Sequence, residues 1–115
     1  MRAPKPGLRV TRAERPRVPG ATARTVDGPR TKRELLDAIA EALEFPGWTG
    51  RNWDALADAL RDLSWLPPGA YALIWRHPDR LDPGDHATAV DVLSRAADES
   101  AGTDRPLTVL LAPGR

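Results

Sequence analysis

Three aspartates at helical spacing are the residues of this sequence that most clearly suggest chemistry. Asp54, Asp58 and Asp62 lie at positions i, i+4 and i+8, so on a helix their side chains fall within about 80° of one another. The leucines of the same stretch fall on the opposite side: Leu56, Leu60 and Leu63. Like charges four residues apart repel by a few tenths of a kcal/mol per pair. The spacing therefore predicts an acidic ridge, either as a solvated helix face or as a surface for a cationic partner.

Aromatic residues beside this ridge favour the partner. Trp48 lies in a short loop between Gly47 and Thr49, where no periodic pattern requires its burial, although a place in the core stays open. Trp53 begins the helix and falls on its leucine side, which predicts core packing or a contact at the rim. Aromatic side chains next to charges are typical of the centre of a protein interface.

The same carboxylates fit an enzyme poorly. Asp54 and Asp58 would stand on an exposed ridge, whereas the paired carboxylates of glycosidases flank a cleft. Carboxylates spread along one helix face also do not converge on a point where Mg²⁺ could bind. The chain has no cysteine, only His77 and His86 as histidines, and no glycine-rich phosphate loop. We therefore expect a protein that is not an enzyme and uses no cofactor and no metal.

Charge divides the chain of 115 residues unevenly. Residues 1–33 hold ten basic and two acidic residues, a net of +8, and residues 34–115 hold seven basic and fourteen acidic residues, a net of −7. Residues 1–20 are rich in arginine and proline and are expected to form a disordered basic tail ahead of one domain over residues 21–112. An acidic domain attracts basic proteins. Nucleic acid is therefore not an expected partner, except weakly through the tail.

Other features of the composition bound the protein's setting. No apolar run is long enough to span a membrane, and no apolar stretch behind the first residues suggests a secretory signal. The lack of cysteine fits a cytoplasmic protein. We expect a monomer, since a small acidic domain that binds one partner through one surface needs no second copy.

Periodicity predicts the elements that position the ridge. Alternating residue character before the turn signal Asp27-Gly28 predicts a strand over residues 21–26, and largely apolar runs predict strands over 70–75 and 107–111. Helical spacing predicts helices over 32–44, 53–63 and 83–99. Thr31 with Glu34 forms a capping-box pattern, Asn52 is placed to cap the helix of the ridge, and Asp82 precedes a proline at a helix start. Apolar strands separated by helices predict an α/β fold with a small three-stranded parallel sheet covered by helices.

The segment Pro46–Leu60 also resembles the barstar family. It carries a proline, an aromatic loop and then Gly-x-Asn-(apolar)-Asp-Ala-Leu-x-Asp-x-Leu, where Gly50, Asn52, Asp54 and Asp58 supply the polar positions and the glycine. Trp75-Arg76 after an apolar strand and the closing strand 107–111 resemble the same family, so the likeness covers residues 21–111.

The resemblance implies an inhibitor of a secreted microbial ribonuclease of the guanyl type, kept in the cytoplasm of the cell that makes the enzyme. It implies a three-stranded parallel sheet with helices, and an acidic second helix laid over the nuclease site. Asp58 would take the place of the scissile phosphate, Asp54 would pair with basic residues at the rim, and Trp48 would pack near the catalytic histidine. Gly50 and Asn52 would shape the loop. The predicted partner-binding set follows: Trp48, Gly50, Asn52, Trp53, Asp54, Asp58 and Asp62.

Two positions depart from the family's pattern. Ala57 stands where the family often has tryptophan, and Arg95 falls where a later helix contributes an acidic residue, unless Asp91 or Asp98 substitutes for it. These departures leave a second interpretation open, in which a barstar-like module of the antitoxin or immunity type binds a basic protein that is not a ribonuclease.

Overall fold

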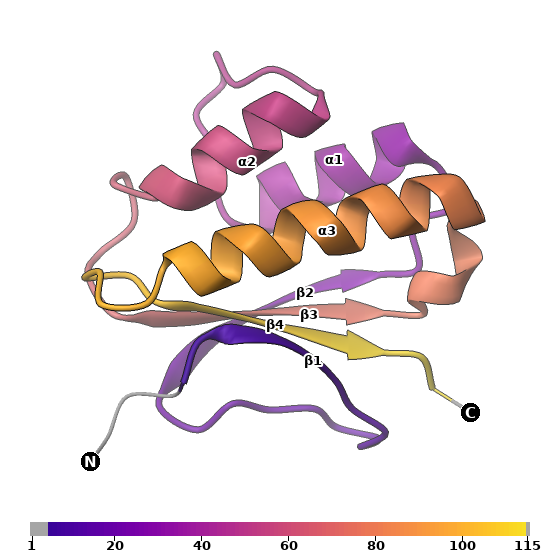
Figure 1. Cartoon of the computed structure of the whole chain (residues 1–115), viewed down its shortest axis with the longest axis horizontal. Helices are drawn as coiled ribbons and strands as arrows, with labels where there is room; N and C mark the ends of the chain where they lie inside the picture. Colours follow the sequence, from indigo (N-terminus) through magenta and orange to yellow (C-terminus); the bar gives the residue numbers. More distant parts are fainter. Residues whose placement is uncertain (1–4, 115) are drawn as a thin grey trace.

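The computed structural model describes residues 5–114 and contains one parallel sheet with its helices on one face (Figure 1). The elements follow in chain order: β1 Gly7–Val10, β2 Ala21–Asp27, α1 Lys32–Ala42, α2 Trp53–Asp62, β3 Ala70–Arg76, a 3-10 turn η1 Pro78–Arg80, α3 Pro83–Glu99 and β4 Leu107–Ala112. The strands lie in the order β1-β4-β3-β2, and all three pairings are parallel. The predicted α/β class, the three helices and the three predicted strands are thus confirmed.

The main core lies between the sheet and the three helices. It is built from alternate residues of the central strands, such as Leu73, Trp75 and Val109, together with the apolar sides of the helices. Leu35 and Ile39 of α1, like the leucines of α2, are almost completely buried there. Burial of these side chains fixes the rotation of each helix, because each buried leucine or isoleucine contributes about 1.5–3 kcal/mol.

The prediction of three strands is wrong, because the sheet has a fourth. Gly7–Val10, within the stretch predicted to be a disordered tail, pairs with β4 from Gly7↔Thr108 to Val10↔Leu111. β4 is buried along all six residues, and such a strand needs a neighbour on each side to satisfy its backbone groups. The largely apolar run at 107–111 was therefore a signal that another strand covers that edge.

The face of the sheet opposite the helices is covered by the connection from β1 to β2. Val18 of this connection is 8% exposed and packs in a second, smaller cluster with Ala72, Ile74, Leu110 and Ala112. Thr11 N donates to Leu111 O (2.8 Å), which fixes the start of the connection to β4. In Figure 1 this connection runs below the sheet, so the two faces have different covers. Residues 1–4 of the predicted tail lie outside the described residues.

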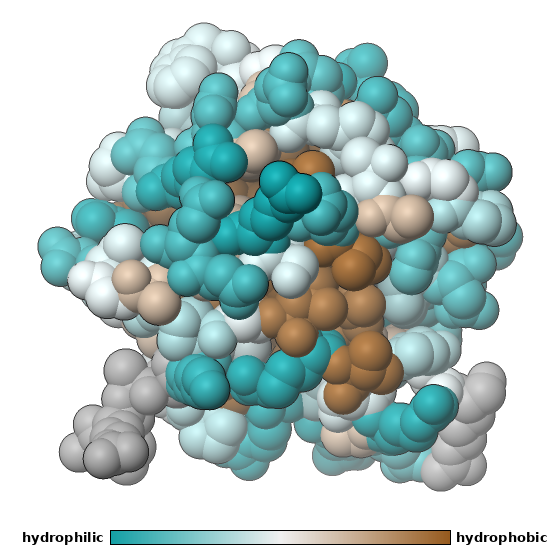
Figure 2. Space-filling view, viewed as in Figure 1, coloured by the Kyte–Doolittle hydropathy of each residue, from teal (hydrophilic) through white to brown (hydrophobic). Residues whose placement is uncertain are grey.

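β1 leaves apolar surface exposed at the edge of the sheet. Leu8 is half-buried against the main core, whereas Val10 is 59% exposed. The face seen in Figure 2 is largely hydrophilic, with one apolar area below α3, where Figure 1 places β1 and β4.

Candidate functional site

The acidic ridge lies on the solvent side of α2. Asp54, Asp58 and Asp62 are all exposed, and the Asp58 side chain is 80% exposed. The leucines on the other side of the helix are buried, as the spacing predicted. The helix begins at a cap made by Asn52, whose Oδ1 accepts from Ala55 N (2.8 Å), which confirms the predicted cap. A capped helix with one buried side holds its carboxylates at fixed positions.

One cation lies close to the ridge. The Arg61 guanidinium is bonded to Glu99 of α3 (Nε to Oε2, 2.7 Å) and stands 3.6 Å from the Asp58 carboxylate. The shorter contact fixes Arg61 toward α3, so it neutralises Asp58 only in part. No ion pair within residues 5–114 involves Asp54 or Asp62. The ridge therefore keeps most of its negative charge available to a partner.

The loop before α2, residues 46–51, is fixed to α1. Arg51 pairs with Asp37 (Nε to Oδ1, 2.9 Å) and donates from NH1 to Thr49 O (2.9 Å). The hydrogen bond from Arg51 lowers the pKa of the Asp37 carboxyl below its ordinary value of 3.8, and Arg33 lowers it further, while burial opposes the shift. Asp37 thus stays charged at neutral pH and keeps Arg51 in place beneath the loop.

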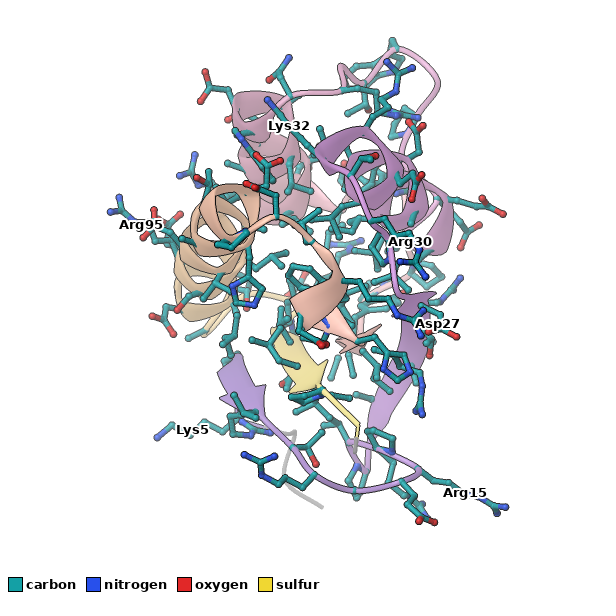
Figure 3. The ribbon with its side chains drawn as sticks, turned by 90° about the vertical axis from the view of Figure 1, so that its right-hand side faces the viewer. Lys5, Arg15, Asp27, Arg30, Lys32 and Arg95 are labelled. Atoms are coloured by element: carbon teal, nitrogen blue, oxygen red, sulfur yellow. The ribbon has the colours of Figure 1, made fainter. Side chains whose placement is uncertain are left out.

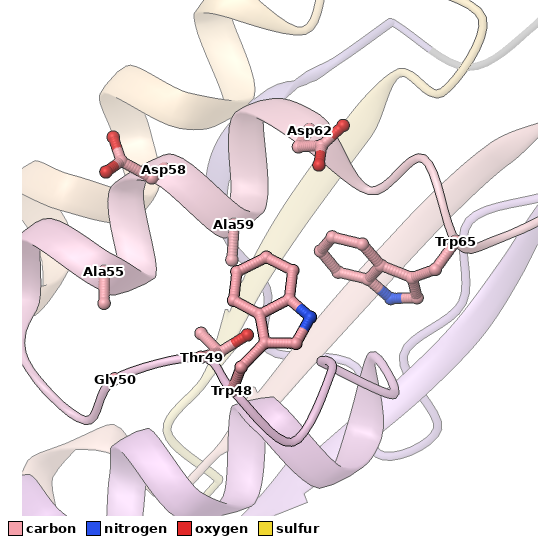
Figure 4. A pocket seen from close by; sticks show the side chains of 8 residues that line it. All are labelled: Trp48, Thr49, Gly50, Ala55, Asp58, Ala59, Asp62 and Trp65. Atoms are coloured by element: carbon pink, nitrogen blue, oxygen red, sulfur yellow. The ribbon is translucent and has the colours of Figure 1, made fainter.

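Trp48 and Trp65 form a groove with the ridge. The hollow has a volume of about 230 Å³, and Figure 4 shows the two indoles on one side and the carboxylate-bearing helix on the other. Its lining consists of Trp48, Thr49, Gly50, Ala55, Asp58, Ala59, Asp62 and Trp65. Trp48 is 82% exposed, which settles that it is not core filling. Thr49 Oγ1 is buried and has no hydrogen-bond partner among the described residues, so the groove keeps one polar group unsatisfied.

The part of the groove formed by Trp65 is rigid. Trp65 donates from Nε1 to Leu43 O (2.9 Å) and meets Phe45 edge to face, with ring centroids 5.7 Å apart. Leu63, in the left-handed conformation (φ 48°), ends α2 and turns the chain so that Trp65 returns to the loop. The groove is therefore apolar at its base and acidic along one rim.

Four of the seven predicted site residues line this groove, and three do not: Trp48, Gly50, Asp58 and Asp62 line it, while Asn52, Trp53 and Asp54 lie outside it. Asn52 acts as the helix cap. Trp53 is half-buried against the main core under Lys32, whose Nζ lies 5.2 Å from the ring centroid. Asp54 remains on the exposed ridge one turn before Asp58.

Gly50 is required by space rather than by backbone conformation. A Cβ at this position would come within 3.1 Å of Asn52 Nδ2 and 3.4 Å of Ala55 Cβ. A side chain at residue 50 would therefore press on the cap that starts α2.

The comparison with known families bears directly on this site. A family model described as Barstar (barnase inhibitor) matches residues 22–112. The chain belongs to the barstar family. A search of curated proteins gave no match. The match includes the loop, the acidic ridge and Trp65, so the whole groove lies within the barstar domain.

Arg95 and Ala57 are the two positions that depart from the pattern of the barstar family. Arg95 of α3 is exposed and pairs with Asp91 (3.1 Å), so its charge is partly balanced within the helix. Ala57 is half-buried on α2.

Within the described residues no group of three histidine, aspartate or glutamate side chains could hold a metal ion, and no helix is long and apolar enough to cross a membrane.

Sequence reasoning missed Trp65 and the alanines of the groove wall. The position of Trp65 depends on the left-handed turn at Leu63, which no local pattern at that leucine indicates. Ala55 and Ala59 line the groove because their small side chains leave room between the ridge and Trp48. A tryptophan two residues after the end of an amphipathic helix was the available signal.

Proposed function

We propose that this member of the barstar family is a stoichiometric protein inhibitor of a secreted microbial ribonuclease of the guanyl type, acting in the cytoplasm of the producing cell. The observation that supports the proposal best is Trp48, 82% exposed beside the Asp58 and Asp62 carboxylates on a groove within the barstar domain. An aromatic ring in water next to fixed negative charge is suited to binding a protein rather than to stabilising this one.

The electrostatics match the site of a ribonuclease. An enzyme that cleaves RNA must bind phosphate in a cationic pocket, and a carboxylate on a rigid helix offers the same charge in a group that cannot be cleaved. Asp58 is the anchor we propose, because it is the middle carboxylate of the ridge and also lines the groove. Opposite charge on the two proteins would also speed their encounter.

The groove supplies the second part of the interface. A side chain of the nuclease entering between Trp48 and the α2 wall would bury apolar surface. Asp62 on the same rim would strengthen binding to a cationic or imidazole group. Asp54, outside the groove, would contact basic residues at the edge of the nuclease site.

A second candidate function rests on Arg95 and on Arg61. The resemblance places Arg95 where the family has an acidic residue on the later helix, unless Asp91 or Asp98 substitutes for it, and Arg61 lies 3.6 Å from the anchor. A partner with a less basic rim than a ribonuclease would fit such a surface. In that case the chain is a barstar-like antitoxin or immunity module whose basic target is a different toxin.

The deciding experiment is an inhibition titration against a panel of secreted microbial ribonucleases. We expect an end point at one inhibitor per enzyme. Asp58→Ala should weaken inhibition about 30-fold or more, because truncating one member of a buried interfacial charge pair generally costs about 2–5 kcal/mol. Asp104→Ala, the same change at an exposed loop residue, should leave inhibition unaltered.

Asp62→Ala serves as the graded comparison. We expect a weaker loss than at Asp58, about tenfold, since Asp62 lies farther along the ridge. A larger loss at Asp62 than at Asp58 would contradict the placing of the anchor. No inhibition of any ribonuclease in the panel, with the chain folded, would favour the second candidate.

A further inference from the structure

Five cations lie on the side of the molecule away from α2. All five are exposed: Lys5 precedes β1, Arg9 lies on it, and Arg12, Arg15 and Arg17 lie on the connection that follows it. Figure 3 shows Lys5 and Arg15 at the end of the molecule opposite Lys32, which begins α1. We call these five side chains the basic surface.

The fold gives the basic surface a fixed base. β1 is hydrogen-bonded to β4, and Thr108 Oγ1 donates to Lys5 O (3.2 Å). Arg76 NH1 donates to Glu14 O (3.4 Å), and Ala21 N donates to Val18 O (3.1 Å) as the connection enters β2. The backbone that carries the cations is thus attached at both ends and in the middle.

No ion pair within residues 5–114 includes any of the five cations. By contrast, Arg24, Arg33, Arg51, Arg61 and Arg95 each pair with a carboxylate elsewhere on the protein. From Lys5 to Gly20 the chain has Glu14 as its sole acidic residue. The basic surface therefore keeps a positive charge of about four, well separated from the acidic ridge.

The composition of the surface points to a phosphate backbone as its ligand. Arginine binds phosphate oxygens through two parallel N–H groups, and four of the five cations are arginines. Residues 5–20 contain no aromatic side chain, so the surface lacks both the anchors of a protein interface and the rings on which bases stack. Such a surface suits a ligand recognised by its regular negative charge.

We propose that the basic surface binds nucleic acid through its phosphates, without reading the base sequence. This inference does not depend on the proposed inhibitor function. The acidic ridge and the basic surface lie on opposite layers of the fold, so a protein on α2 would leave the basic surface free. The acidic side would also orient the molecule, since it is repelled by the same polyanion.

The test measures fluorescence anisotropy of a labelled 20-nucleotide single strand, as RNA and as DNA of the same sequence, with the full chain. Each neutralised phosphate of a single strand contributes about −0.7 to the slope of log K against log salt. Five contacts predict a slope of about −3.5 for both strands. A variant with Arg9, Arg12, Arg15 and Arg17 changed to Gln should bind at least tenfold more weakly at low salt, with a slope near −0.7.

The matched control changes the same number of charges elsewhere: Arg30→Gln, Arg33→Gln, Arg61→Gln and Arg95→Gln. We expect it to keep most of the affinity and the full slope. Equal losses in the two variants, both shown to be folded by circular dichroism, would overturn the proposal, because net charge alone would then explain binding. Polyglutamate that competes as well as RNA at equal charge would also overturn it and would indicate an acidic protein as the ligand.

Discussion

The α2 side of the molecule is acidic and is built on a regular helix. The β1 side is basic and is built on a short strand and an irregular connection. The acidic ridge stands on a capped helix whose other side is buried, and its neighbour Trp48 is held by the Arg51–Asp37 pair. The basic surface stands on a short edge strand and an irregular connection anchored at a few points. From this difference we infer that binding at the acidic side depends on the exact placement of its side chains, whereas binding at the basic side depends on the number of its charges.

Trp48→Ala gives the largest effect that this comparison predicts beyond the Asp58 variant. We expect an affinity loss for the ribonuclease of about 2 kcal/mol, or about 30-fold, as for an aromatic hot spot. The midpoint of thermal unfolding should stay unchanged, because the side chain is already 82% exposed. A lowered midpoint would mean that Trp48 supports the fold, and the exposed groove would then lose its role as evidence for a partner.

Val18→Ala sharpens the comparison from the other side. The loss of two methyl groups from the cluster beneath the sheet should lower the free energy of unfolding by about 1–2 kcal/mol. Ribonuclease inhibition should be unchanged, since Val18 lies on the opposite layer from α2. Urea unfolding and the inhibition titration together check both expectations, and a matching loss of inhibition would show that the two faces are coupled.

Asn52→Ala should cost about 1 kcal/mol of stability, the usual effect of losing a helix cap. Unlike Val18→Ala, it should also weaken inhibition, because the first turn of α2 positions Asp54 and Asp58. Asn52→Asp keeps a capping oxygen and is the control. If Asn52→Ala unfolds more easily in urea but inhibits as the wild type does, placement of the ridge matters less than we infer.

The smallest effect concerns pH. The folded pKa of Asp37 is lowered, so its pair with Arg51 stabilises the protein above the ordinary pKa of 3.8 and is lost as pH falls through the folded value. We therefore expect wild type and Asp37→Asn to differ in unfolding midpoint at pH 6 and to converge as the pH falls through the folded pKa of Asp37. The difference should be small, because the pair is exposed to solvent. A gap that stays constant with pH would contradict the assigned cause.

The sequence predicted most of this fold because periodicity is local. The spacing of Leu56 and Leu60 fixed which side of α2 is buried, and Asn52 marked its start. β1 was missed because only Leu8 and Val10 stand out in an arginine- and proline-rich stretch, and the strand forms by pairing with β4, a contact about 100 residues away in sequence. The spacing also predicted that Asp54 and Asp58 share one face of the helix. It did not predict the groove beside that face.

The pairing of β1 with β4 has a consequence for how the protein is made. β4 lies between β1 and β3 in the sheet. Until β4 has been synthesised through Ala112, β1 and β3 therefore lack the strand that lies between them. Joining parts of the chain so distant in sequence is slow, because the entropy of a large loop must be lost before any contact forms. Helix α2 and the β2–β3 pair are made earlier, but the core beneath α2 lacks Leu107, Val109 and Leu111 of β4 during that interval. The nascent chain should therefore complete its binding surface only after β4 has been made.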